Sequence, residues 1–268
     1  MAIITISRGS YSKGKEVAER AAELLGYSCI SRDLLVEASE QFNIPEIKLV
    51  RALHDAPSIL ERFTYGKEKY LAYVESAFLK HAQKDNMIYH GLAGHFFLTG
   101  VQHVLKVRVL ADIEDRVRLE TEREKIQPEE ARHVLVKDDQ ERRQWSRKLF
   151  GIDTWDPSLY DMVLHIRRLA VEDAASIICH TVKLPHFQTT PESQAVLDDL
   201  VLASDVKVKL VDTYPNLQVT AHEGIVSIDT SWMMQSAPQL ADEIEEKVKK
   251  IPGVRDIKVH VSLRSPDV

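Results

Sequence analysis

The sequence predicts an α/β domain built on a parallel sheet, followed by a small α+β module. Two observations predict the α/β domain: short apolar runs alternate with amphipathic segments of helical period, and the first run leads through a glycine-containing loop into a helix. After residue 191 the order changes to helix, strand, strand, helix, strand, which predicts the second module. With 268 residues, 44% of them hydrophobic and 28% charged, the chain is neither disordered nor fibrous.

The elements of the first part follow in order from apolar periodicity and from helix-ending residues. Core strands are expected at 3–7, 27–30, 87–89, 104–110 and 162–166. Helices are expected at 16–25, which Gly26 ends, within 33–84 except around Pro45 and Pro57, and at 171–179. Residues 112–148 hold 10 Lys and Arg and 11 Asp and Glu, so we expect one or two exposed helices there that cannot be buried.

Residues 185–191 contain two prolines and little periodicity, which predicts a linker. The predicted domains are therefore 1–184 and 192–268. In the second we expect helices at 192–211 and 238–251, and strands at 217–221, 225–229 and 254–261, the first two joined as a hairpin at His222-Glu223-Gly224.

Charge and composition restrict the functions to consider. The formal net charge is −6, and residues 191–268 carry 8 basic against 13 acidic side chains, so we expect no nucleic-acid partner. No apolar run reaches the length of a membrane span and the first residues read as a strand, so we expect a cytoplasmic protein without membrane association. Two cysteines fit a reducing compartment. The spacing of His90, His95 and His103 is not a ligand pattern, so no metal site of the protein's own is predicted.

The loop after the first strand has the spacing of a phosphate-binding loop. Residues 9–15 read Gly-Ser-Tyr-Ser-Lys-Gly-Lys and fit G-x-x-x-x-G-K, between a predicted strand and a predicted helix. Such a loop wraps backbone N–H groups around phosphate, and Lys15 would reach the β- and γ-phosphates of ATP. The predicted nucleotide-binding residues are Ser10, Tyr11, Ser12, Lys13, Gly14, Lys15 and Glu16. The alternative is a glycine turn with a surface lysine.

Glu16 departs from the usual loop, which has Ser or Thr at this position to bind Mg²⁺. A carboxylate there would either contact the metal through water or repel the nucleotide. Further along, Arg143 and Arg147 lie four residues apart on one helix face beside Arg142, so they would form a cationic edge that a closing lid brings onto a phosphoryl group. The alternative is that these arginines pair with acidic neighbours on the helix surface.

At these residues the chain resembles the cytidylate-kinase-like proteins of the P-loop nucleoside monophosphate kinase superfamily, from Ile4 to about Ile178. The first loop of that group reads roughly I-S-R-x-x-G-S-G-G-R-E-I-A, and this chain has Ile-Ser-Arg-Gly-Ser-Tyr-Ser-Lys-Gly-Lys-Glu-Val-Ala at 6–18. The lid segment D-x-x-R-x-x-(aromatic)-x-R-x-x-F-G matches residues 139–151, and W-D-x-x-x-Y-D matches residues 155–161. The resemblance implies a P-loop kinase-type parallel sheet with flanking helices and a helical lid.

The resemblance also implies roles for individual residues. Lys15, Arg142 and Arg147 would be catalytic, and Arg32, Asp33, Asp139 and Arg143 would contact the substrate, with ATP and Mg²⁺ as cofactors. The group has an Arg-Asp pair that contacts the acceptor nucleotide, and here the matching positions are Leu92 and Ala93. Its second strand ends in Asp-Arg, where this chain has Ser31-Arg32-Asp33. The identity of the acceptor therefore stays open.

Residues 224–228 and 251–259 resemble the second strand, and the approach to the last strand, of a BON-type domain. Two functions follow. The first is ATP-dependent phosphoryl transfer to a nucleotide-like acceptor. The second is a catalytically weak or inactive nucleotide-binding regulator, whose C-terminal module senses a ligand or mediates association. The dense lid arginines favour the first, and Glu16, Leu92 and Ala93 favour the second. Homo-oligomerisation is left open by both.

Overall fold

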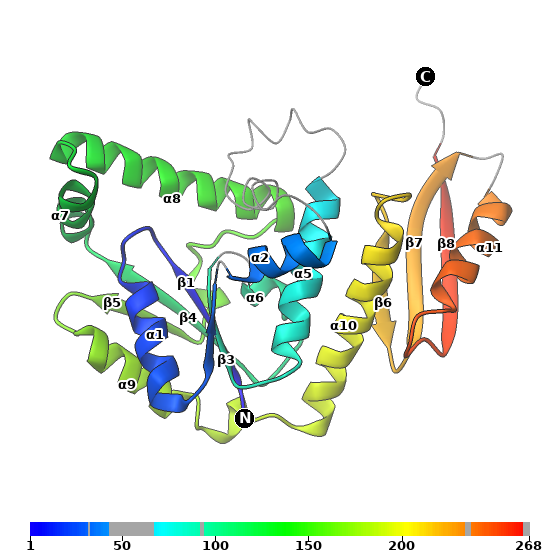
Figure 1. The fold of residues 1–268 in the computed structure, drawn as a ribbon, viewed down its shortest axis with the longest axis horizontal. Coiled ribbons are helices and arrows are strands. Elements are labelled where there is room, and N and C mark those ends of the chain that lie inside the picture. The colour runs from blue at the N-terminus through cyan, green and yellow to red at the C-terminus, as the bar shows by residue number, and fades with distance from the viewer. Residues whose placement is uncertain (32, 43–66, 92–93, 234–236, 265–268) are drawn as a thin grey trace.

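The computed structural model describes residues 1–31, 33–42, 67–91, 94–233 and 237–264. Its larger sheet is parallel throughout, with the strand order β2-β3-β1-β4-β5 (Figure 1). The strands are β1 (Ile3–Arg8), β2 (Ser28–Ile30), β3 (Met87–His90), β4 (Val104–Ala111) and β5 (Met162–Ile166). All five lie where the apolar runs predicted them, so the prediction of a parallel α/β sheet is confirmed.

Helices cover both faces of this sheet (Figure 1). On one face, α1 (Gly14–Leu25) and α9 (Val171–Thr181) pack on the alternate strand residues that include Ile4, Ile6 and Val107. On the other, α2 (Asp33–Phe42), α5 (Lys67–Ala82) and α6 (Gly94–Phe97) enclose a core with Phe78 and Met87. The short helix α6 is not marked by sequence periodicity. The predicted interruptions at Pro45 and Pro57 lie outside the described residues.

The charged segment forms two helices, α7 (Ile113–Glu124) and α8 (Pro128–Phe150), which extend over the carboxyl end of the sheet (Figure 1). The prediction that this segment cannot be buried is wrong in part. Arg116 is 7% exposed, Glu120 is 4% exposed and Trp145 is 1% exposed. Because Arg116 has a carboxylate partner, its burial does not leave an unpaired charge, which a count of charged residues cannot foresee.

The C-terminal part has the predicted order helix, strand, strand, helix, strand: α10 (Pro191–Leu210), β6 (Gln218–His222), β7 (Ile225–Met233), α11 (Ala237–Val248) and β8 (Asp256–Arg264). β6 and β7 form the predicted hairpin, and its turn residues Glu223 and Gly224 both have positive φ, at 50° and 81°. β8 pairs in parallel with β7. Among the described residues, no helix is long and apolar enough to cross a membrane.

The helix α10 contributes to both hydrophobic cores. Leu197 and Val201 belong to the core of the parallel sheet, whereas Val206 and Leu210 belong to the core of the small sheet. The predicted linker at 185–191 begins with a 3-10 turn, Pro185–Phe187, and Thr189 donates its backbone N–H to the carbonyl of Met1 at 2.9 Å. One helix, α10, therefore belongs to both cores. The division into domains 1–184 and 192–268 remains a prediction.

Candidate functional site: a cationic pocket at the loop after β1

The loop between β1 and α1 has the backbone form of an anion-binding nest. Tyr11 and Lys13 have positive φ, at 56° and 60°, and they alternate with Ser12 and Gly14, whose φ is not positive. Such alternation turns successive N–H groups toward a common point, and α1 adds the positive end of its dipole. The Ser12 hydroxyl donates to the Gly9 carbonyl at 3.0 Å and holds the loop closed.

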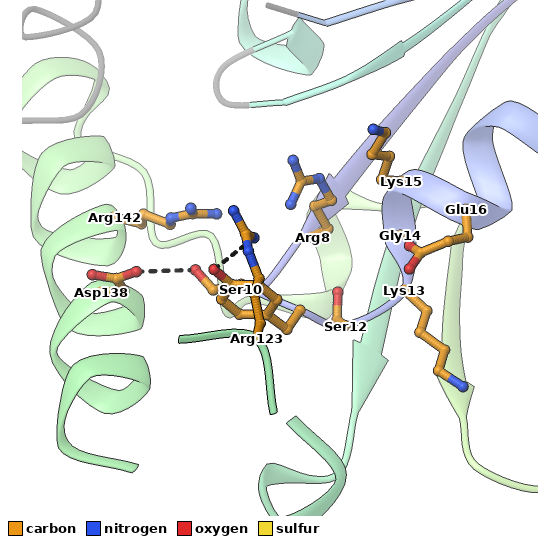
Figure 2. Close-up of a pocket in the computed structure, with 11 residues that line it drawn as sticks. Arg8, Ser10, Ser12, Lys13, Gly14, Lys15, Glu16, Arg123, Asp138 and Arg142 are labelled. Carbon is orange, nitrogen blue, oxygen red and sulfur yellow. Dashed lines mark hydrogen bonds between the residues drawn. The ribbon is translucent and has the colours of Figure 1, made fainter. Parts of the chain in front are cut away.

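This loop forms one wall of a pocket of about 310 Å³ (Figure 2). All seven predicted nucleotide-binding residues line it, from Ser10 to Glu16. The other lining residues come from the end of β1, from α7 and from α8: Arg8, Arg123, Asp138 and Arg142. Five side chains of this lining are cationic and two are acidic, so the pocket attracts anions.

Of the predicted catalytic residues, only Lys15 and Arg142 line the pocket. Lys15 extends along the helix surface, with its Nζ 3.6 Å from Glu19 and its side chain 60% exposed. Arg142 faces the loop from α8 (Figure 2). The three arginines were predicted to form one cationic edge, but of these only Arg142 lines the pocket.

Arg143 and Arg147 share one carboxylate outside the pocket lining. Arg143 donates to the two oxygens of Asp153 at 2.7 and 2.6 Å, and Arg147 donates to one of them at 2.6 Å. These hydrogen bonds, Arg143 first, hold the pKa of Asp153 well below its usual range. The guanidinium of Arg143 also lies 4.2 Å from the ring centroid of Trp155. Both arginines therefore bind the segment that follows α8.

Asp139, predicted to contact the substrate, binds Arg116 instead. The guanidinium of Arg116 donates to both carboxylate oxygens at 2.7 and 3.0 Å, and its Nε donates to the backbone carbonyl of Ser10 at 2.6 Å. Ser10 also donates its hydroxyl to Asp138 at 3.2 Å. Arg116 and these two acids therefore fix the lid helix α8 against the phosphate-binding loop.

Tyr11 makes a second connection between the loop and α7. Its hydroxyl accepts a hydrogen bond from Arg123 at 2.9 Å, and the guanidinium lies 5.3 Å from the ring centroid. Burial, and then the hydrogen bond to Glu120, raise the pKa of Tyr11. The family motif has glycine at this position. Here the side chain of Tyr11 connects the loop to α7.

The stretch that matches W-D-x-x-x-Y-D lies between α8 and β5 and contacts β4. Tyr160 is buried and donates its hydroxyl to the Thr154 carbonyl at 3.0 Å, while it accepts from Arg108 at 3.1 Å. Asp161 accepts from the backbone N–H of Lys106 at 2.8 Å, which aligns β5 with β4. These contacts give the motif a structural role.

Sequence reasoning did not select Arg8, Arg123 or Asp138 as site residues, although all three line the pocket. The one available signal was for Arg8, which ends a buried strand directly before the glycine loop. Arg32, Leu92 and Ala93 lie outside the described residues. Asp33 begins α2 in the chain segment that follows β2.

Fold and pocket together place the protein in the class of P-loop kinase-like proteins. The sequence model of the Cytidylate kinase-like family matches residues 3–168, which is more than half of the chain, and the protein belongs to this family. No curated protein matches the chain by sequence.

Three solved structures align with this chain at low sequence identity. An uncharacterized protein from Eubacterium ventriosum aligns with a TM-score of 0.53 at 19% identity, over 69% of this chain and 99% of that one. A shikimate kinase from Acinetobacter baumannii in complex with shikimate aligns with a TM-score of 0.41 at 17% identity, over 69% and 96% of the two chains. A dephospho-CoA kinase from Campylobacter jejuni aligns with a TM-score of 0.34 at 13% identity, over 68% and 97%. The first of these likenesses shows a shared fold.

Proposed function

We propose that the protein transfers a phosphoryl group from ATP to a nucleotide-like acceptor. The observation that carries this proposal is the cationic pocket, in which a nest-forming loop faces Arg142 of the lid. Phosphoryl transfer needs positioning and neutralisation of charge more than covalent chemistry from the protein. The loop amides would hold the β- and γ-phosphates of ATP, with Lys15 swinging in from Glu19. Arg142 would neutralise charge on the transferring group.

Mg²⁺ fits this pocket as a partner of the nucleotide rather than as a resident ion. Glu16 and Asp138 are the carboxylates of the pocket lining. In the described part of the chain, no group of three or more His, Cys, Asp or Glu side chains could hold a metal by itself. Mg²⁺ keeps several waters and binds substrate phosphates with only one or two carboxylates, which these two acids match. When bound, it would supply further neutralisation of phosphate charge.

The roles proposed for Arg143, Arg147 and Asp139 require a rearrangement. Arg143 and Arg147 would have to leave Asp153, and Asp139 would have to leave Arg116, before any of them touched a substrate. An acceptor that carries phosphate offers the arginines an anion to exchange for this carboxylate. Substrate contacts from Arg32 and Asp33 remain part of the proposal.

A second candidate function is a nucleotide-binding regulator with little or no turnover. The exposure of Lys15, its proximity to Glu19 and the presence of Glu16 in the pocket favour it. In this version the α-β-β-α-β module, which we propose is BON-like, senses a ligand or mediates association. For both candidate functions we propose a cytoplasmic location.

A screen of nucleoside monophosphates in a coupled phosphotransfer assay, beside calorimetric titration with ATP and Mg²⁺, separates the two functions. Turnover with one acceptor supports the kinase, and tight binding of ATP without turnover supports the regulator. Lys15→Ala should weaken ATP binding by about 1.5–3 kcal/mol, the range for charged hydrogen bonds, without loss of fold. Unchanged affinity in that variant would contradict the role of Lys15.

Closure of the lid is a further test of the kinase. Hydrogen exchange through residues 135–150 should slow when ATP and Mg²⁺ are added, because the lid arginines gain phosphate partners. Arg142→Ala and Arg147→Ala should lower turnover much more than ATP affinity, because both charges are proposed to act on the transition state. Full activity of both variants would contradict the roles proposed for Arg142 and Arg147.

A further inference from the structure

The side chain of Arg8 enters the pocket across the first residue of α1 (Figure 2). A Cβ added to Gly14 would lie 2.7 Å from the Cβ of Arg8 and 2.9 Å from its Cδ, distances that real Cβ atoms essentially never show. Gly14 has no positive φ, so its backbone conformation does not require glycine. At this position glycine is required because the stem of Arg8 passes there.

The guanidinium that this stem carries has no anionic partner in the described part of the chain. Its Nε is buried and makes no hydrogen bond. Burial lowers the pKa of Arg8, the charge of Arg142 lowers it further, and the Glu16 carboxylate acts in the opposite direction. Because an arginine stays protonated in proteins, the two neighbouring guanidiniums repel each other across the pocket. A bound anion would offset this repulsion and give the buried Nε of Arg8 the hydrogen bond that it lacks.

Lys15 is in the opposite situation. It is mostly exposed, and its ammonium group already lies near Glu19. Its charge is therefore hydrated and partly paired when no ligand is bound. Arg8 is only partly exposed, and its Nε is buried without a hydrogen-bond partner.

Resting on the proposed function, we infer that Arg8 is a phosphate-binding residue of this pocket, and that Arg8 and Arg142 bind the same phosphoryl group of ATP from opposite sides. The planar guanidinium of Arg8 can give two parallel hydrogen bonds to one phosphate, which an ammonium group cannot. The end of β1 thus supplies a cation in addition to the lysine of the loop.

The test is a calorimetric titration of ATP and Mg²⁺ into the full-length wild type and three variants. Arg8→Gln keeps most of the stem that packs on Gly14 but removes the charge, and should weaken ATP binding at least about tenfold. Arg8→Lys keeps the charge without the paired donors, and should bind ATP more tightly than Arg8→Gln. Arg20→Gln is the matched control, because Arg20 lies exposed on α1, where it pairs with Glu23. The Arg20→Gln variant should bind ATP with the affinity of the wild type.

Thermal melting of each variant accompanies the titrations. Wild-type affinity in Arg8→Gln would overturn the inference and leave Arg8 as a packing partner of Gly14. Equal weakness of Arg8→Gln and Arg8→Lys, with wild-type melting temperatures, would support phosphate binding through the paired guanidinium donors rather than through charge alone. A wild-type protein that binds no ATP contradicts the proposed function itself. Wild-type binding with an unaffected Arg8→Gln variant contradicts only this inference.

Discussion

Replacing Arg116 with methionine tests whether the contact between lid and loop stabilises the fold. The guanidinium of Arg116 makes three hydrogen bonds: two to the Asp139 carboxylate and one to the Ser10 carbonyl. Methionine fills a similar volume and makes none of them. The variant therefore leaves a carboxylate and a carbonyl without their donor at a junction where α7, α8 and the loop meet.

The expected loss follows from the burial of this ion pair. Removing one partner of a buried pair costs about 3–5 kcal/mol, because the other charge remains without compensation. The Asp139 side chain is 20% exposed, so water can solvate part of the orphaned charge. We therefore expect the free energy of unfolding to fall by about 3 kcal/mol, the lower end of that range.

Urea denaturation followed by tryptophan fluorescence measures this loss, since Trp145 is buried in the same helix as Asp139. Arg118→Met is the control: Arg118 lies on α7 with its side chain 67% exposed, and its loss should cost less than about 0.5 kcal/mol. Adding Asp139→Asn to Arg116→Met should recover part of the stability, because no charge is then left unpaired. Equal free energies of unfolding for Arg116→Met and Arg118→Met would refute the reasoning.

Three other variants test the core, the pocket and the pH dependence. Leu197→Ala should lower the free energy of unfolding by about 2–4 kcal/mol in urea denaturation, whereas the exposed Val196→Ala should change it little. Gly14→Ala should displace the stem of Arg8 and weaken ATP binding in calorimetry, and wild-type affinity would contradict the tight crossing. Burial lowers the pKa of His95 to about 3. Below about pH 6.5, His95 therefore binds a proton in the unfolded chain but not in the folded one. Stability should therefore fall as the pH drops from about 6.5 toward 4, and His95→Asn should show a flatter dependence in urea denaturation at several pH values.

The sheet could be predicted because its strands are local patterns. A parallel strand buried on both faces reads as an apolar run, as Ile3–Ile6 does, and a single glycine such as Gly26 ends a helix. The α6 helix is only four residues long and has no period to detect. Its position depends on packing against β1 and α5, which a window of sequence does not contain.

The pocket could be predicted on the side formed by the loop and, on the opposite side, only at Arg142. Arg123, Asp138 and Arg142 reach it from α7 and α8, more than a hundred residues further along the chain. Helical spacing correctly placed Arg143 and Arg147 on one face, since both bind Asp153. Which face meets the loop depends on how α8 docks, and that docking depends on the long-range pair of Arg116 with Asp139.

The dual role of α10 has a thermodynamic consequence. One helix that completes two hydrophobic cores cannot unfold for one sheet and stay folded for the other. Polar contacts reinforce this, since Lys207 of α10 pairs with Glu75 of α5 at 3.1 Å. Gln83, directly after α5, donates to Asp198 of α10 at 2.8 Å. The two sheets should then melt in a single calorimetric peak. A nucleotide bound only at the loop after β1 would, by mass action, raise the melting temperature of the distant β6–β8 sheet as well.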